Sequence, residues 1–401
     1  MLTVKPFQAV RPTRDKVHLV ASRSYVSYTV TQLRRKLHEN PYSYLHIIHP
    51  DIGKSKLHKL DMEGRFDLVR KKYNEFVAKE YLMKDEKPSF YLYRQTKKDH
   101  QFIGIIAAVA IDDYLKGRVK IHEQTLSKRQ EIFTSYLDVT NVNAEPVLLI
   151  SEKSDELKKI YGKYTCQRPE YDFTQVTFVR HELWCIDDAE DTKHISAIFE
   201  KQDALYIADG HHRCASSAAL CEKRRALNPG DITSPHNYFL AYIIDESNVK
   251  IYAFNRLVKD LNGLSEEEFM AELGLEFDIL PTSQSENEDE VMMYLHKHWY
   301  SLRLKSGLKI EAQTISDKIL SPILGIHDLR KDKRVSFIEQ PRGLEVLKHS
   351  VDRNHFKIAF ALKPVSVADL KKVADVNGTM PPKSTWIEPK LRSGMVIYEL
   401  A

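Results

Sequence analysis

The chain has 401 residues, of which 42% are hydrophobic and 29% charged, an ordinary globular composition that excludes a wholly disordered protein. Its 60 Lys and Arg residues nearly balance 56 Asp and Glu residues, and a net charge of +4 gives no electrostatic footprint for a dedicated nucleic-acid-binding protein. At ~100–200 residues per domain, the length predicts two packed domains or one elaborated domain.

Several features indicate the compartment. The four cysteines are widely separated and form no CxxC pair, which argues against a disulfide framework and fits a reducing environment. Lys5 and Pro6 stand where a secretory signal would need an apolar run, and the longest apolar run, residues 103–111, is far short of the ~20 residues that span a bilayer. We expect a soluble, cytoplasmic protein that binds neither nucleic acid nor membranes.

Hydrophobic spacing and proline positions predict the elements of the first third of the chain. In chain order we expect an edge strand with loops over 4–20, a short helix over 31–39 ended by Asn40-Pro41, a β-rich run over 44–48, an amphipathic helix over 66–81, and a hairpin of strands 89–95 and 102–110 around Lys97-Lys98-Asp99.

The same reasoning covers the rest of the chain. We expect a helix after Thr125, strands over 146–150 and 204–207, an alanine-rich helix over 214–227, a hairpin of 238–244 and 250–254 with its turn at 245–248, a helix with Ser265 as N-cap and Glu268 at the capping-box position, a surface loop over 283–290, and a strand over 357–362. This mixture, without an internal repeat, indicates an α+β or α/β fold.

The densest polar motif runs from Tyr206 to Arg213 and reads YIADGHHR. A strand, a glycine turn and a helix start place free backbone N–H groups and the positive end of a helix dipole at one point, which favours phosphate. The predicted phosphate-binding groups are listed here: Gly210, His211, His212, Arg213, Ser216 and Ser217. Asp209 is the predicted Mg²⁺ ligand, because phosphate chemistry usually needs a hard cation held by carboxylates, and the two histidines are candidates to orient or protonate a leaving oxygen.

A structural interpretation of this motif makes Asp209 an N-cap, Gly210 a tight turn and the histidines surface residues. A zinc site built from His211 and His212 is disfavoured, because neighbouring residues point in different directions and no Cys or HxxxH spacing supports it.

Two further segments carry polar groups. Lys120-Ile121-His122-Glu123-Gln124-Thr125 precedes a predicted helix, so Glu123 is either a dipole-stabilised first-turn carboxylate or a catalytic base. The segment 380–394, MPPKSTWIEPKLRSG, carries basic and hydroxyl side chains that either close over an anion or form a basic surface loop. Candidate substrate-binding residues are His122, Thr125, Asn255, Arg256, Lys383, Ser384 and Thr385.

The blocks PFQAVRP, NPYSYLHIIHPD, YRQT, KIHEQT, LYIADGHHR, FNRLVKDLNGLS and MPPKSTWIEPKLRSG together resemble a widespread bacterial family of formerly unknown function, related to free-serine kinases with a ParB/sulfiredoxin-like fold. The blocks run from residue 5 to residue 400, whereas the likeness to the ParB/sulfiredoxin-like core covers roughly residues 118 to 225. The chain departs from the family near its N-terminus, where Pro-Pro-Tyr-Asp-Val is replaced by Ser22-Arg23-Ser24-Tyr25-Val26.

The resemblance implies an α+β fold in which a core over 118–230 lies between an N-terminal region, 1–117, and a C-terminal region, 231–401, that completes the site. It also implies transfer of a phosphoryl group to the hydroxyl of free L-serine, giving O-phospho-L-serine, with pyrophosphate, ADP or ATP as the donor. Glu123 corresponds to the family's base, and the DGHHR turn corresponds to its phosphate-binding loop.

Two alternatives stay open at this point. The same groups serve both directions of a reversible transfer, so a phosphoserine phosphatase fits the same residues. A ParB-like nucleotide-binding regulatory protein is the second alternative, against which the near-neutral charge and the lack of a recognisable helix-turn-helix motif argue. Walker-type and protein-kinase chemistry are excluded, because neither GxxxxGK[ST] nor the VAIK and HRD motifs occur.

Overall fold

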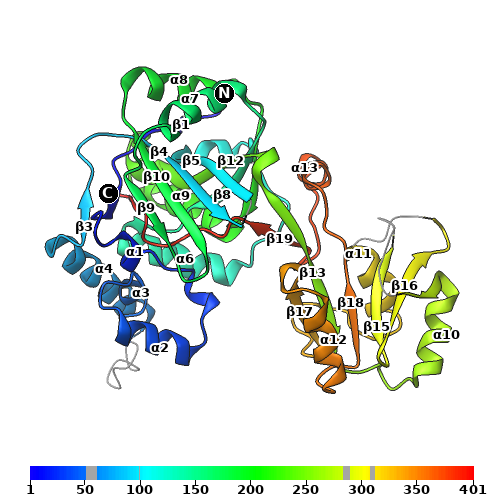
Figure 1. Ribbon diagram of the computed structural model, residues 1–401. Coiled ribbons are helices and arrows are strands. Elements are labelled where there is room, and N and C mark those ends of the chain that lie inside the picture. Colours follow the sequence, from blue (N-terminus) through cyan, green and yellow to red (C-terminus); the bar gives the residue numbers. More distant parts are fainter. Residues whose placement is uncertain (51–60, 99, 283–289, 308–311) are drawn as a thin grey trace. The chain divides into compact units, whose positions relative to one another are not determined.

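In the computed structural model, the chain divides into two units, Met1–Val249 with Pro389–Ala401 (unit 1) and Lys250–Glu388 (unit 2). The structure describes residues 1–50, 61–98, 100–282, 290–307 and 312–401. The division differs from the three regions predicted, because segments from 1–117 and from 118–230 contribute strands to the same sheet of unit 1 (Figure 1).

Unit 1 is built on a mixed sheet in the order β6-β11-β8-β12-β5-β4-β10-β9, with β1 paired to β5. Its strands are β1 (Val4–Lys5), β4 (Phe90–Lys97), β5 (His100–Ala110), β6 (Val119–Lys120), β8 (Val147–Ser151), β9 (Tyr171–Thr174), β10 (Val179–Ile186), β11 (Leu205–Asp209) and β12 (Tyr238–Asp245). The pairs β11–β6 and β12–β8 are parallel, whereas β4, β5, β10 and β12 pair antiparallel. Two short ladders join β2 (Val10–Pro12) to β3 (Leu82–Lys84) and β7 (Val142–Asn143) to β20 (Tyr398–Glu399).

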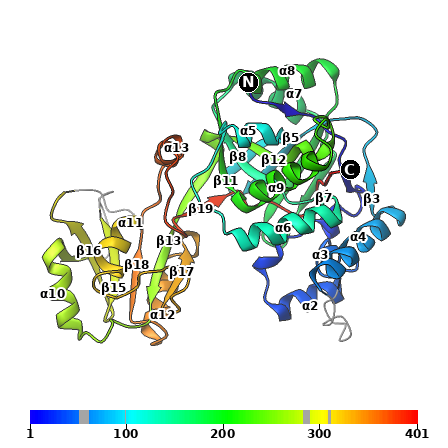
Figure 2. The same cartoon turned by 180° about the vertical axis from the view of Figure 1, so that it is seen from behind.

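The helices of unit 1 are α1 (Val17–Val20), α2 (Val30–Glu39), α3 (Leu45–Ile48), α4 (Met62–Ala78), α5 (Ile111–Leu115), α6 (Ser127–Thr140), α7 (Asp155–Thr165), α8 (Ala189–Glu200) and α9 (His211–Leu227). Alternate strand residues such as Ile105, Ala107 and Leu149 pack with side chains of α7, α8 and α9 in one buried cluster. A second cluster joins α3, α4 and β7 to the C-terminal Ile397, so the end of the chain is part of this unit's core. Figure 2 shows α6 lying beside α9.

Unit 2 contains a sheet in the order β14-β16-β15-β18-β13-β17, with β19 also paired to β13. Its strands are β13 (Lys250–Val258), β14 (Phe277–Pro281), β15 (Val291–Leu295), β16 (His298–Leu304), β17 (Val335–Glu339), β18 (Ile358–Ala361) and β19 (Thr385–Glu388), and its helices are α10 (Glu266–Glu276), α11 (Ala312–Ile315), α12 (Leu344–Asp352) and α13 (Val367–Asp375). Separate apolar clusters centred on Phe269 and Phe360, and on Leu347, form its core.

Many sequence predictions are confirmed. The amphipathic spacing over 66–81 falls within α4, the hairpin is β4 with β5, where Lys97 lies opposite His100, and Asp99 lies outside the described residues. The capping box of α10 is present, with Ser265 Oγ accepting from the backbone N–H of Glu268. The mixed α+β class is confirmed by both sheets and their helices.

Two element predictions are wrong. The β-rich run over 44–48 is helix α3, because Ser43 Oγ accepts from the N–H of Leu45 and the single turn buries Leu45 and Ile47. The hairpin over 238–254 does not form, because β12 pairs with β5 and β8 whereas β13 pairs with β17, β18 and β19. Of the loop predicted over 283–290, residues 283–289 lie outside the described residues.

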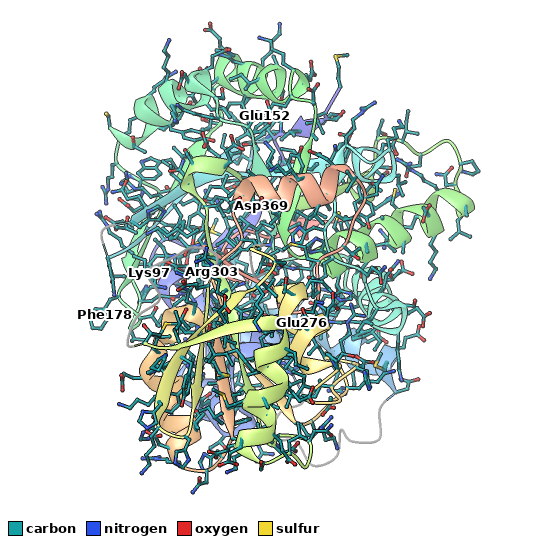
Figure 3. All side chains as sticks on the ribbon, turned by 90° about the vertical axis from the view of Figure 1, so that its right-hand side faces the viewer. Lys97, Glu152, Phe178, Glu276, Arg303 and Asp369 are labelled. Carbon is teal, nitrogen blue, oxygen red and sulfur yellow. The ribbon has the colours of Figure 1, made fainter. Side chains whose placement is uncertain are left out.

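The surface of unit 1 includes an exposed apolar tip between β9 and β10. Val176 and Phe178 are 88% and 85% exposed, and Figure 3 shows Phe178 at the margin of the molecule. Across the described ranges, no helix combines the length and the apolarity needed to cross a membrane.

Candidate functional site

The site begins at the end of β11, where the strand carries a bulge. Ile207 lies opposite Leu149 and Asp209 lies opposite Leu148, so Ala208 is the extra residue. A bulge of this kind re-aims a side chain beside a functional site. It turns Asp209 to the face of the sheet that carries Leu148, away from the helix-covered face that carries Leu149.

Asp209 lies between two cations and is about half exposed. Its Oδ2 is 3.5 Å from Arg213 Nη2 and 3.5 Å from Lys390 Nζ, and 46% of its side chain is accessible. Burial works against ionisation of the carboxyl, but Lys390 and Arg213 outweigh it and hold the pKa of Asp209 below its usual range. Asp209 is therefore a carboxylate at neutral pH.

Gly210 connects the strand to helix α9 and needs to be glycine. Its φ is 104°, in the left-handed region, and a Cβ there would lie 3.0 Å from the Arg213 guanidinium. The first intrahelical bond runs from the N–H of Cys214 to the carbonyl of Gly210, which leaves the N–H groups of residues 211–213 without an intrahelical acceptor. Within the described part of the chain, no side chain caps this 17-residue helix, so its N-terminus can receive an anion.

His211 and His122 form a buried pair beside Glu123. The rings pack edge to face with centroids 4.5 Å apart, and the backbone N–H of His122 donates to His211 Nε2 at 3.4 Å. Burial lowers the pKa of His122 to about 4 and that of His211 well below its usual range, with His122 adding to the second effect. Both rings are neutral at pH 7.

The tautomer of His211 follows from these contacts. Because Nε2 accepts from His122, the proton of the neutral ring is on Nδ1, which lies 3.7 Å from Glu123 Oε2. Glu123 is 47% exposed, so a polar N–H faces a carboxylate that solvent and a small molecule can reach. The predicted pairing of the KIHEQT and DGHHR motifs in one site is thus observed in the geometry.

Arg213 is anchored on both sides. Its Nη1 donates to the carbonyl of Pro146, and its Nη2 faces Asp209. Ser216 Oγ donates to the carbonyl of His212 at 2.7 Å, and Ser217 Oγ donates to that of Arg213 at 2.9 Å. Both hydroxyl hydrogens are therefore used within α9, and a role of the two serines in phosphate binding stays a prediction.

Of the candidate substrate-binding residues, His122 and Thr125 lie in unit 1. Thr125 Oγ1 donates to Gln130 Oε1 at 3.3 Å, near the start of α6.

The other candidates belong to unit 2 and serve its framework. Asn255 Oδ1 accepts from the N–H of Leu362 at 3.0 Å, and Ser384 Oγ donates to the carbonyl of Pro381 at 2.8 Å. Lys383 Nζ lies 5.1 Å from the centroid of the Phe254 ring. Thr385 begins β19, opposite Ala253 on β13.

Arg256 is fully buried, and burial lowers its pKa to about 10. Its Nη1 donates to the carbonyl of Phe254, while Nε and Nη2 find no partner among the described residues.

Lys390 is a site residue that the predicted set omits. Its ammonium contacts Asp209, and its carbonyl accepts from Gln95 Nε2 at 3.4 Å, which fixes the segment Pro389–Gly394 in unit 1. The signal was present, because Lys390 lies in the basic motif 380–394, but nothing local shows that its partner is Asp209. The two ends of that motif lie in different units.

The donor set for a metal is sparse. Among the described residues, no group of three or more His, Cys, Asp or Glu side chains could hold a metal ion. Asp209 supplies one carboxylate, which fits a Mg²⁺ ion that takes most of its oxygens from phosphate and water.

Comparison with solved structures gives low identities. A conserved hypothetical protein from Pyrococcus furiosus is 15% identical, with 76% of this chain and 97% of that chain covered and a TM-score of 0.38. SbnI with a C-terminal truncation from Staphylococcus aureus is 13% identical, with coverages of 72% and 85% and a TM-score of 0.41. A free serine kinase in complex with AMP is 13% identical, with coverages of 75% and 95% and a TM-score of 0.37.

Sequence comparison is more direct. No curated protein matches the sequence. The profile of DUF1015, described as a protein of unknown function, matches residues 4–326, which is most of the sequence, and the chain therefore belongs to the DUF1015 family.

Proposed function

We propose that the chain is a phosphotransferase that moves a phosphoryl group to the hydroxyl of free L-serine, giving O-phospho-L-serine, with pyrophosphate, ADP or ATP as donor. The observation that carries this proposal is the half-exposed Glu123 carboxylate beside the first residue of a helix whose N-terminal N–H groups are open. A base and an anion site at one point are what phosphoryl transfer to an alcohol needs.

Glu123 is the base in this proposal. It removes the proton from the serine hydroxyl, whose oxygen then forms a bond to the transferred phosphorus while the bond to the leaving group breaks. The leaving group is phosphate from pyrophosphate, AMP from ADP or ADP from ATP. Neutral His211 directs its Nδ1–H at Glu123 and so orients the carboxylate without neutralising it.

The backbone of residues 210–213 holds the donor phosphates, together with the Arg213 guanidinium. Lys390, which the structure adds to the site, places a second cation at the same carboxylate. Because little covalent chemistry is demanded of the protein, positioning and charge stabilisation by these groups provide the catalysis.

Mg²⁺ is the proposed cofactor, with Asp209 as its protein ligand and donor oxygens and water completing the octahedron. When bound, the ion would neutralise charge on the phosphates. Asp209 already contacts two cations, so we expect Mg²⁺ to bind weakly without a polyphosphate and more tightly with one. Equilibrium dialysis of Mg²⁺ with and without pyrophosphate measures this difference.

The ParB/sulfiredoxin-like core over 118–230 remains part of the proposal. β6, β8, β11 and α9 lie within this range, and they carry the base, the turn and the helix start.

Phosphorus NMR of the full chain with Mg²⁺ and L-serine tests the proposal, with pyrophosphate, ADP and ATP in parallel. We expect a phosphoserine signal with at least one donor. No signal from any donor would refute transfer to free serine. Phosphoserine incubated alone distinguishes the hydrolase, because inorganic phosphate would then appear without a donor.

A further inference from the structure

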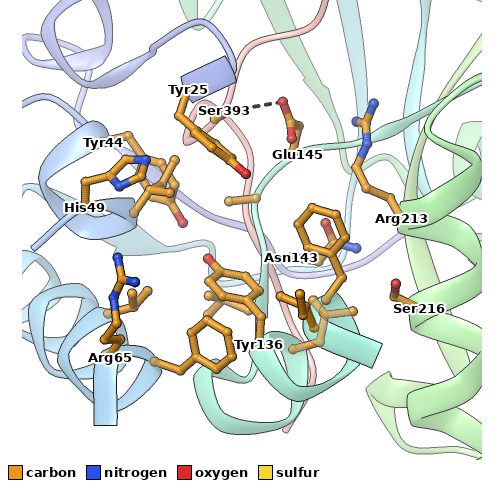
Figure 4. Close-up of a pocket in the computed structure, with 18 of the residues that line it drawn as sticks. Tyr25, Tyr44, His49, Arg65, Tyr136, Asn143, Glu145, Arg213, Ser216 and Ser393 are labelled. Carbon is orange, nitrogen blue, oxygen red and sulfur yellow. Dashed lines mark hydrogen bonds between the residues drawn. The ribbon is translucent and has the colours of Figure 1, made fainter. Parts of the chain in front are cut away.

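A cavity of about 240 Å³ lies in unit 1 next to the phosphate turn. Three groups of residues surround it: Tyr25, Tyr44 and His49 before α4, Phe66 on α4, and Phe133 and Tyr136 on α6. Arg213 and Ser216 of α9 form the wall nearest the phosphate turn (Figure 4). Aromatic rings make up much of its lining, which suits a flat, uncharged ring system.

The cavity is not purely apolar. Figure 4 shows the hydroxyls of Tyr25, Tyr44 and Tyr136 directed toward the same space, with Glu145 and Asn143 on the opposite side. Tyr44 is 1% exposed, and its hydroxyl is buried without a hydrogen-bond partner in the part of the chain that the structure describes. A buried hydroxyl without a partner is costly, so this atom indicates a ligand that supplies one.

The position of Tyr44 is built in by sequence. A Cβ on Gly394 would lie 2.3 Å from the Tyr44 ring, so only glycine allows the ring to sit there. Ser393, beside it, donates to Glu145 Oε1 at 3.4 Å, and the N–H of Gly394 donates to the carbonyl of Ala144. The end of the MPPKSTWIEPKLRSG motif therefore shapes this cavity.

Helix geometry assigns the cavity to one side of the transferred phosphoryl group. Residues 211 and 213 are two positions apart, so they project on opposite sides of α9. His211 faces Glu123, the acceptor side, whereas Arg213 lines the cavity together with Ser216, three residues along the same face. Because attacking and leaving oxygens lie roughly in line, the body of the leaving group belongs on the cavity side.

We propose that this cavity is the base subsite of a nucleoside di- or triphosphate donor, an inference that rests on the phosphotransferase proposal and selects a nucleotide over pyrophosphate. The phosphates contact the N-terminus of α9, and the base lies among Phe66, Phe133 and Tyr136. A base with an exocyclic amino group fits best, because Glu145 accepts and the Tyr44 hydroxyl gains its missing partner.

Calorimetric binding of ADP, UDP and pyrophosphate to the full chain with Mg²⁺ tests the subsite without depending on turnover. In the wild type we expect ADP to bind at least ~10-fold more tightly than pyrophosphate, and more tightly than UDP, which lacks the amino group. Ala144→Leu, which extends a lining side chain into the cavity, should weaken ADP at least ~10-fold and leave pyrophosphate unchanged. Ala189→Leu on exposed α8 is the matched control.

Tyr44→Phe removes only the unpartnered hydroxyl, so it keeps the packing even if Ala144→Leu does not fold. It should weaken ADP about 3–10-fold, as expected for one hydrogen bond, with pyrophosphate again unchanged. Equal affinities for ADP and pyrophosphate, or variants that weaken both alike, would overturn the subsite. ADP binding that follows these expectations without phosphoserine formation would keep the subsite and refute serine as the acceptor.

Discussion

The turn after β11 in unit 1 and strand β13 in unit 2 both carry charged and amide side chains, but these side chains differ in what they contact. At the turn, Asp209 contacts two cations and about half of its side chain remains accessible. On β13, Asn255 is 1% exposed and bonds a backbone amide of its own unit. Accessible charge that faces other charge marks a reactive site, whereas a buried amide that satisfies the backbone marks a framework.

The largest expected effect comes from removing the base. Glu123→Gln should lower kcat by ~10²–10⁴-fold, because the amide cannot accept the acceptor's proton, while donor affinity stays within about twofold. Steady-state phosphoserine formation and donor calorimetry measure the two quantities. Glu131→Gln on the exposed face of α6 is the control. Loss of donor affinity in Glu123→Gln would make Glu123 a structural residue instead.

Arg213 tests the phosphate side of the same comparison. Arg213→Ala should weaken donor binding ~10–100-fold, because a charge-assisted contact is lost and Asp209 keeps only Lys390 beside it. Arg35→Ala on α2, an exposed arginine paired with Glu39, controls for net charge. Donor affinity that is the same in Arg213→Ala and wild type would remove Arg213 from the site.

The buried histidines predict a pH dependence of stability. The folded pKa of His122 is about 4 against a usual 6.5, so the unfolded chain binds more protons between these values. The stability that neutral His122 contributes is complete above pH 6.5 and is lost as the pH falls toward 4, amounting to about 2 kcal/mol at pH 5. His181, whose pKa burial and then Arg392 lower to about 3, acts in the same direction.

Thermal unfolding between pH 7 and pH 4.5 measures this dependence. His122→Asn should flatten the curve, whereas His18→Asn at an exposed position should not. A curve for His122→Asn that parallels the wild type would show that His122 is not a buried neutral group.

Local sequence was sufficient for the turn itself. The strand, the glycine at positive φ and the helix start are all encoded within residues 205–227, and their order is what the structure has. The match of the DUF1015 family to residues 4–326 confirms the family-level likeness, while the ParB/sulfiredoxin relation stays a prediction.

Long-range contacts were not accessible in this way. Strand β12 was placed in a hairpin with β13 because the two are adjacent in sequence, yet its partners are β5 and β8. The contact between Lys390 and Asp209 joins the last part of unit 1 to β11, and no periodicity reports such a pair. The helix over 45–48 depended on one side-chain bond from Ser43, against a run of residues that favours strands.

Asn255 provides the smallest effect and the sharpest test of the framework side. Asn255→Ala should destabilise unit 2 by about 1–2 kcal/mol, because the buried N–H of Leu362 loses its acceptor. Hydrogen exchange at the Leu362 amide should accelerate, while donor affinity and the KM for L-serine stay unchanged. Asn228→Ala at the exposed end of α9 is the control. A rise in the KM for L-serine without faster exchange would instead make Asn255 a substrate-binding residue, as the sequence alone predicted.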